Sequence, residues 1–334
     1  MPLNRSMRLL LPWLLFALLL ALPLTDPSSN TVRLLFTTAV WIISSIAWNL
    51  LGGLTGQVSF GFAVFYGLGA YTTALMINSG RNPFFAFLGG MGIAVLASFL
   101  VGLPTFRLRG PYFAIATIGV GEATRVIMNN LDITGGASGY RIIERTPFRQ
   151  LEHYYTAVIV VAIALAVSAL VVHSKFGLAL RAIKQDQEAA ADLGVDPYIS
   201  KLWVHAIAAG LTGIAGGIYA RYHAFIYPGD VFAFPTSISI LLMPVIGGIG
   251  TVWGPVLGGV IFGMVEETLT VKFPNTHLLL YGLLLILIIL FEPDGLVGLL
   301  RRLSALIKAR RSREDSGSNG TDEVLRRRSR VEGR

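Results

Sequence analysis

Long apolar segments recur along most of the chain and constrain its fold more than any other feature. A helix needs about 20 apolar residues to cross the hydrocarbon core of a bilayer, and about ten such segments are present. They fall near residues 8–24, 34–51, 58–78, 84–103, 111–128, 154–173, 202–220, 236–250, 255–271 and 278–293. Backbone polar groups inside a bilayer must be satisfied within the protein, so segments of this length are helices. We therefore predict an all-α, polytopic transmembrane helix bundle of about ten spans.

Composition supports this prediction. Only 14% of the 334 residues are charged and 54% are hydrophobic, whereas soluble domains carry about 25% charged residues. So few charges suit a surface that faces lipid. The 37 glycines agree, because glycine lets membrane helices approach closely. Cysteine is absent, which excludes disulfides and cysteine-ligated metal sites.

Two parts of the span assignment are open to a second interpretation. Arg5 and Arg8 precede a leucine-rich run, as in a signal peptide. A small-x-small cleavage site does not follow, only Ala21-Leu22-Pro23, so we favour an uncleaved first span. The stretches 58–78 and 236–271 are the least secure, because Gly, Pro and polar residues interrupt them.

Positive charge is concentrated at the C-terminal end. The net charge is +8, and residues 301–334 hold 11 Lys/Arg against 5 Asp/Glu. Basic residues beside a membrane span mark its cytoplasmic side and give no reason to infer nucleic-acid binding. We predict a transmembrane domain over 1–300 and a basic, disordered cytoplasmic tail over 301–334.

The loop charges predict an orientation. With ten spans, most basic loop residues fall on one side, which the positive-inside rule makes cytoplasmic. These are Arg5, Arg8, Arg107, Arg109, Lys175, Arg181, Lys184 and the tail. Both termini are then cytoplasmic. The loop at 129–153, with mixed charges, falls on the outer side.

A polar loop between two apolar spans is the strongest functional candidate. Residues 176–197 read FGLALRAIKQDQEAAADLGVDP. The alanines favour a helix, and Gly194 with Pro197 supplies its stop. Within it, Glu188-Ala189-Ala190 precedes Gly194, and small alanines let a helix seat against another protein. The alternative is an ordinary amphipathic connector.

Glycines spaced four apart suggest close helix packing. Such a spacing places a smooth stripe on one helix face. The candidates are Gly52 and Gly56, Gly213 and Gly217, and Gly250, Gly254 and Gly258. Packing is the preferred interpretation for all of them over a ligand role.

Four polar residues are candidates for lining a transport pathway. Gln57 and Ser59 lie in an interrupted span, and unwound backbone at membrane depth is tolerated where it lines a cavity. Interhelical hydrogen bonding explains them equally well. Glu122 and Arg125 are three apart on one helix face, where they can pair. We favour a structural ion pair, with gating or substrate contact as the alternative.

Motifs for nucleotide binding, hydrolytic catalysis and metal binding are missing from the sequence. No GxxxxGK[ST] phosphate loop, Ser/His/Asp set or HExxH motif is present. His205 and His223 lie too far apart to suggest a metal site. We therefore expect no catalysis, no metal and no cofactor on this chain, and any coupling to ATP must come from a partner.

The quoted loop resembles the EAA loop of ABC importer permeases, which docks on the ATP-binding subunit. Leu51–Tyr71 is similar to the TGQ-x-S-x-G signature of branched-chain amino acid ABC permeases. Arg109–Tyr140, Ser239–Gly259 and Phe291–Leu296 resemble that family's YFA…GE…R…N…TGG, GG-x-GT-x-WGP-x-x-G and F-x-P-x-GL elements. The resemblance covers about residues 34–300 and fits the longer of the two paired permease types.

The resemblance implies the fold of such a permease, in a bacterial cytoplasmic membrane. It implies a coupling loop at 174–200 and partners: a second permease subunit, two ATP-binding subunits and an extracytoplasmic binding protein. Related permeases for urea, short amides or other small polar solutes look much alike and stay as alternatives. A secondary transporter would need buried acids, and only Glu122 qualifies. A membrane-embedded enzyme would need a polar catalytic cluster.

Overall fold

The computed structural model describes residues 28–143 and 147–272, together with separate positions between 276 and 298. The predicted first span at 8–24 and the predicted tail at 301–334 lie outside the described residues. Most of the predicted span at 278–293 lies outside them as well.

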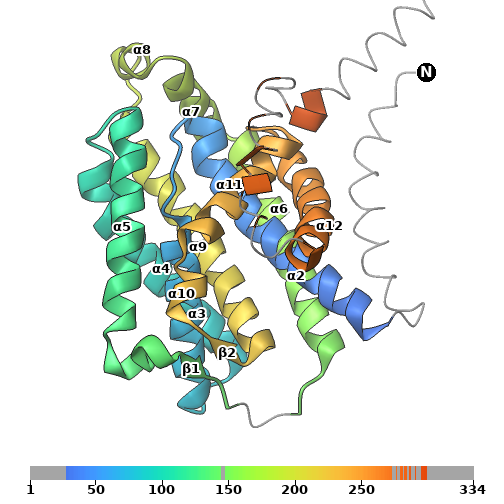
Figure 1. Ribbon diagram of the computed structural model, residues 1–334. Helices are drawn as coiled ribbons and strands as arrows, with labels where there is room; N and C mark the ends of the chain where they lie inside the picture. The colour runs from blue at the N-terminus through green and yellow to red at the C-terminus, as the bar shows by residue number, and fades with distance from the viewer. Residues whose placement is uncertain are drawn as a thin grey trace, which may run out of the picture.

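The described chain is a helical bundle with two very short strands (Figure 1). Its helices are α2 (Ser29–Trp48), a π-helical turn η2 (Asn49–Gly53), α3 (Phe62–Asn78), α4 (Pro83–Thr105), α5 (Pro111–Asn129), α6 (Gln150–His173), α7 (Lys175–Gln185), α8 (Gln187–Asp192), α9 (Pro197–His223), α10 (Pro228–Val231), α11 (Phe234–Gly247) and α12 (Gly254–Lys272). Two 3₁₀ turns, η3 (Asp132–Thr134) and η4 (Gly136–Ser138), precede β1 (Tyr140–Arg141), which pairs antiparallel with β2 (Phe225–Ile226).

Five stretches of the described chain are long and apolar enough to cross a membrane. They are Ser29–Gly53, Pro83–Thr105, Gln150–His173, Pro197–His223 and Pro228–Gly247. They confirm the predicted all-α polytopic bundle. The predicted spans at 58–78, 111–128 and 255–271 are also helical, as α3, α5 and α12, although α3 begins only at Phe62.

Capping residues and prolines explain where several helices begin. The Asn82 side chain accepts a hydrogen bond from the Phe84 N–H at 2.9 Å, and Pro83 follows as the first residue of α4. Asp196 caps α9 in the same way, immediately before Pro197. These residues satisfy N–H groups that have no partner inside the helix.

α9 lies in the interior and packs against α2, α3 and α4. The backbones of α3 and α9 meet directly at Gly213: a Cβ on Gly69 of α3 would lie 2.0 Å from the Gly213 carbonyl oxygen. A Cβ on Gly217 would lie 2.4 Å from Thr73 Oγ1. The Gly213–Gly217 stripe is therefore a packing surface, as predicted.

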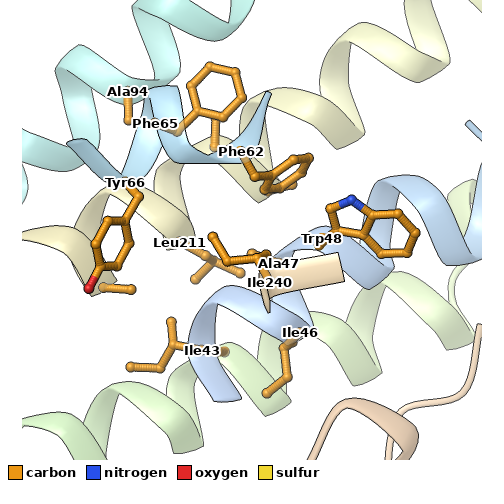
Figure 2. Close-up of a cluster of buried hydrophobic side chains, with 14 of the residues drawn as sticks. Ile43, Ile46, Ala47, Trp48, Phe62, Phe65, Tyr66, Ala94, Leu211 and Ile240 are labelled. Carbon is orange, nitrogen blue, oxygen red and sulfur yellow. The ribbon is translucent and has the colours of Figure 1, made fainter. Parts of the chain in front are cut away.

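Large apolar side chains form a buried cluster within the bundle (Figure 2). Trp48, Phe62 and Phe65 are fully buried. His205 of α9 is buried among aromatic rings, with the Phe65 and Phe106 centroids 5.0 and 5.1 Å away. It is a core histidine, and the described residues contain no group of three metal-ligating side chains.

The two other glycine stripes are not continuous, which corrects the prediction. Gly56 follows the end of the helix with a φ of +73°, and Gly250 lies in the turn between α11 and α12 with a φ of +76°. Four-residue spacing is a stripe only where the helix continues, and here both helices have ended. Gly52, Gly254 and Gly258 do pack closely: their added Cβ atoms would meet Trp48, Gly248 and Met243.

Candidate functional site

The predicted docking loop folds as two short helices, α7 and α8, at one end of the bundle (top of Figure 1). The prediction of helix is correct, but the helix breaks at Asp186. This residue has an extended conformation, with φ −154° and ψ 117°. Because of this break, the axis of α8 does not continue the axis of α7.

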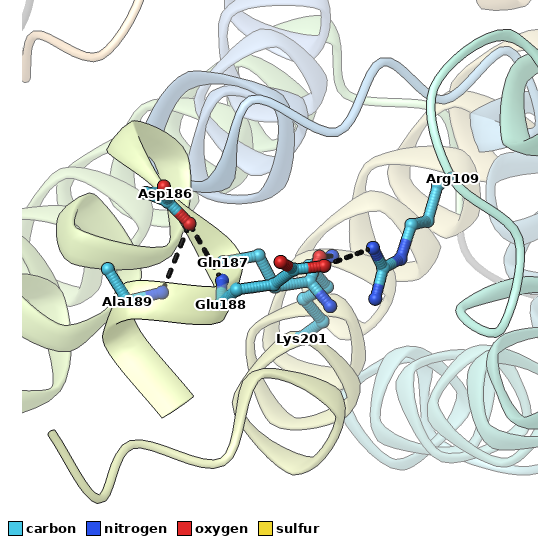
Figure 3. Close-up of polar contacts among 6 residues, drawn as sticks. All are labelled: Arg109, Asp186, Gln187, Glu188, Ala189 and Lys201. Atoms are coloured by element: carbon cyan, nitrogen blue, oxygen red, sulfur yellow. Dashed lines mark hydrogen bonds and ion pairs between the residues drawn. The ribbon is translucent and has the colours of Figure 1, made fainter. Parts of the chain in front are cut away.

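Asp186 is the cap of α8 (Figure 3). Its Oδ1 accepts hydrogen bonds from the backbone N–H groups of Glu188, at 2.8 Å, and Ala189, at 3.0 Å. Glu188 thus sits in the first turn of α8, where a carboxylate interacts favourably with the helix dipole. Sequence analysis missed Asp186, although an Asp before a short alanine run is an N-cap signal.

Gly194 ends α8 with a φ of +86°, a conformation that favours glycine. The Val195 N–H bonds the Ala190 carbonyl at 3.1 Å and the Gly194 N–H bonds the Ala191 carbonyl at 2.9 Å. Together these bonds form a Schellman ending. The predicted glycine stop is confirmed.

α8 buries one residue and exposes most of the others. The Glu188 side chain is 76% exposed and Leu193 is 83% exposed, and Ala189 is exposed as well. Ala190, in contrast, is only 2% exposed. Of the predicted docking residues, Ala190 therefore holds α8 on the bundle, while Glu188 and Ala189 are exposed at the surface.

Three basic side chains attach this loop to the spanning helices. Lys201 Nζ, at the start of α9, donates to Gln187 Oε1 at 2.8 Å. Arg109 Nη1, from the loop between α4 and α5, donates to Glu188 Oε1 at 2.8 Å. Lys184 Nζ of α7 donates to the Gly53 carbonyl at 2.9 Å. The last contact joins the loop to η2.

η2 is in turn tied to the turn between α11 and α12. Asn49 Nδ2 donates to the Thr251 carbonyl at 2.9 Å, and Asn49 Oδ1 accepts from the Gly250 N–H at 2.7 Å. Asn49 is buried. Its side chain satisfies the Thr251 carbonyl and the Gly250 N–H, two backbone groups that lie outside helices. Lys184, Gly53, Asn49 and Gly250 thus connect α7 to two helix breaks.

The Thr55–Ser59 segment confirms the predicted break, since residues 56–61 are not helical. Ser59 is only 1% exposed; its Oγ accepts from the Gly61 N–H at 3.3 Å, and its carbonyl accepts from Trp48 Nε1 at 2.8 Å. Gln57 is half-buried. Ser59 therefore serves the local backbone, whereas Gln57 keeps an accessible surface.

Glu122 and Arg125 form the predicted ion pair on α5. Arg125 Nε donates to Glu122 Oε2 at 3.0 Å, and a second contact joins Arg125 Nη2 to Glu122 Oε1. The pair does not face the interior of this chain: the Glu122 side chain is 54% exposed. α5 buries only Phe113, Thr117 and Met128, so its outward face carries the charges.

The apolar spanning helices, the broken helices and the exposed α7–α8 loop define a multi-pass membrane protein of the transport permease class. A family model described as "Branched-chain amino acid transport system / permease component" matches residues 30–289. The chain belongs to this family, which confirms the resemblance drawn from its motifs.

Several curated proteins are similar to this chain. It is 30% identical over 305 residues to the high-affinity branched-chain amino acid transport system permease protein LivM of Escherichia coli, covering 82% of this chain and 71% of that protein. It is 25% identical over 285 residues to LivH of the same organism, covering 78% and 92%. It is 25% identical over 315 residues to the probable LivM of Methanocaldococcus jannaschii, covering 77% and 90%. No solved structure matches.

Proposed function

We propose that this chain is a permease subunit of an ABC importer and forms half of the translocation pathway for branched-chain amino acids. The observation that carries the proposal is the family match over residues 30–289. LivM is the relative with 30% identity, which favours the longer of the two paired permease types. Chemistry occurs on partner subunits, and this chain supplies the path, with no catalytic residue and no cofactor of its own.

The α7–α8 loop is the proposed docking site for an ATP-binding subunit. Glu188, Ala189 and Leu193 present an acidic, a small and an apolar side chain on one short, capped helix. Gly194 contributes by ending that helix. Movement of α8 reaches the spanning helices through the Lys184–Gly53 hydrogen bond and then through Asn49 to Gly250.

The outward face of α5 is the proposed pathway face. A charged pair at membrane depth is costly against lipid and needs a polar neighbour or a water-filled path. Glu122 and Arg125 have such surroundings if the face of α5 that carries them lines the pathway at the contact with a second permease subunit. Relatives named LivM and LivH are both similar to this chain, which supports a pair of related permeases. Gln57 belongs to the same proposal, as a pathway-lining side chain.

The orientation of the chain in the membrane indicates the side on which each remaining partner binds. Arg109, Lys175, Arg181 and Lys184 lie at the α7–α8 end or in the loop that contacts it. The positive-inside rule makes that end cytoplasmic. An extracytoplasmic binding protein then delivers substrate at the opposite end, ATP binds only to the partner subunits, and both termini are cytoplasmic in a bacterial inner membrane.

Leucine uptake tests this proposal in cells of the source organism, with and without this gene. Uptake is expected to be lost on deletion and restored by the wild-type gene. Excess isoleucine or valine should compete with leucine, and excess urea should not. If leucine uptake is untouched while urea accumulation falls, the substrate proposal is wrong and the alternative of a urea or amide permease replaces it.

A charge reversal tests the docking proposal separately. Glu188→Arg should reduce uptake at least ten-fold at equal amounts of membrane-inserted protein, because it reverses the charge of the exposed docking helix. Lys175→Glu is the matched control: it reverses an exposed charge at the start of α7, away from α8. Normal uptake by the Glu188→Arg protein would sink the docking role.

A further inference from the structure

A groove of about 810 Å³ opens on the surface of the bundle at the end opposite α7 and α8. Its walls come from α4 and α6, both of which pack against α9. The lining side chains are mainly apolar and include Phe84, Phe87, Ile159, Val160 and Ile163. Neither the docking loop nor the pathway face uses this groove.

The groove has the length of one bilayer leaflet. Along α6 its lining runs from Glu152 to Ile163, which is about 16 Å at 1.5 Å per residue. The hydrocarbon core of a bilayer is about 30 Å thick. The groove therefore begins near the membrane surface and ends near the midplane. This depth suits an acyl chain of one leaflet, whereas a spanning helix from a partner would need a groove of about twice the length.

The rim of the groove is apolar and open to the surroundings. Phe84 is 63% exposed, Ile159 54% and Ile163 50%. Phe87, Val160 and Ile214 are half-buried and form its floor. α4 and α6 are spanning helices, so these side chains lie within the bilayer and face lipid acyl chains.

The mouth of the groove is positively charged. Arg81 is exposed in the α3–α4 turn, and in the described part of the chain no carboxylate lies within ion-pairing distance of its guanidinium. Arg221 and Glu152, also at the mouth, pair with each other at 2.9 Å and cancel in charge. Asn82 caps α4 through its side-chain oxygen, which leaves its NH₂ group as a further donor.

We propose that this groove binds one phospholipid with an anionic headgroup. One acyl chain lies against Phe87, Val160 and Ile163, and the phosphate lies at Arg81 and Asn82. An arginine guanidinium suits a phosphate because it combines charge with two parallel donors. The site is independent of the transported substrate.

Lipid retention by the full-length chain in detergent tests the proposal by native mass spectrometry. Phosphatidylglycerol, which is anionic, and phosphatidylcholine, which is zwitterionic, are titrated separately. One phosphatidylglycerol should be retained in preference to phosphatidylcholine. Arg81→Gln should weaken phosphatidylglycerol binding about five-fold, since one basic side chain near a lipid surface contributes about that much. It should weaken phosphatidylcholine binding less, because the choline ammonium already offsets the charge of that lipid's phosphate.

Two further variants separate the headgroup site from the acyl groove. Ile163→Trp fills the inner end of the groove at a half-exposed position and should weaken the binding of both lipids. Arg141→Gln removes another exposed arginine of the same end, outside the groove lining, and should change neither. Equal retention of the two lipids by the wild type, or equal losses in Arg81→Gln and Arg141→Gln, would overturn the proposal. So would a cross-link from Ile163→Cys to the second permease subunit.

Discussion

Arg109 Nη1 lies 2.8 Å from Glu188 Oε1, across a separation of 79 residues, and joins the α4–α5 loop to the first turn of α8. Both side chains are largely exposed, at 70% and 76%. Surface ion pairs of this kind contribute little to stability. The contact therefore sets the position of an exposed carboxylate, and the fold does not depend on it.

The first prediction concerns the cap of α8. Asp186→Ala removes two hydrogen bonds to the backbone, which costs about 1 kcal/mol of local helix stability. In a six-residue helix, Asp186 is the residue that satisfies the free backbone N–H groups of the first turn. We expect the ATP-binding subunit to co-purify with this variant several-fold less than with the wild type. Asp186→Asn keeps a capping oxygen and should bind normally; equal loss in both variants would contradict the capping role.

The second prediction concerns transmission from the loop to the spanning helices. Lys184→Met keeps the length of the side chain but removes the bond to the Gly53 carbonyl. Co-purification of the ATP-binding subunit should be unchanged, because α8 is intact, while leucine uptake falls several-fold. Lys175→Met, at an exposed lysine of the same helix, should leave uptake unchanged. Unchanged uptake by Lys184→Met would show that this hydrogen bond does not couple the α7–α8 loop to the spanning helices.

The third prediction concerns helix packing. Gly69→Ala places a Cβ 2.0 Å from the Gly213 carbonyl oxygen, and backbone cannot move aside as a side chain can. Overpacking of this kind costs about 1–3 kcal/mol, so the melting temperature in detergent and the yield of inserted protein should fall. Gly92→Ala in α4, where an added Cβ meets nothing within 4 Å, should have the melting temperature of the wild type. Equal melting temperatures for the two variants would mean that α3 and α9 do not touch.

The sequence could predict the spans because apolar length is a local property. It also predicted that α8 ends at Gly194, since a left-handed glycine before a proline-started helix has a local signal. It could not separate Gly213, inside a continuous helix, from Gly56 and Gly250, which follow helix ends. Spacing is identical in the two cases, so glycine spacing alone does not show where the helix stops.

Contacts between residues distant in the sequence could not be predicted, because they depend on tertiary packing. The pairing of Arg109 with Glu188 depends on how α4 and α7 are placed in the bundle. Burial of Ala190 beside exposed Ala189 depends on which face of α8 meets that bundle. Glu122 and Arg125, by contrast, pair within one turn, and their spacing alone was enough to predict the contact.

The last prediction concerns this pair, for which a structural and a pathway role give different results. Glu122→Gln or Arg125→Gln alone leaves an unpaired charge at membrane depth, which is costly. Each single variant should therefore reduce the amount of permease that assembles with its partner subunit. The double variant Glu122→Gln/Arg125→Gln removes both charges, so its assembly should recover.

Transport by the assembled double variant then decides between the two roles. We expect leucine uptake to stay at least ten-fold below that of the wild type, because an amino acid carries an ammonium and a carboxylate that adjacent Glu122 and Arg125 can bind as the path opens. Uptake per assembled complex is the quantity to compare, measured with the binding protein saturated. Wild-type uptake by the double variant would assign the pair to the structure of α5 alone and remove Glu122 and Arg125 from the pathway.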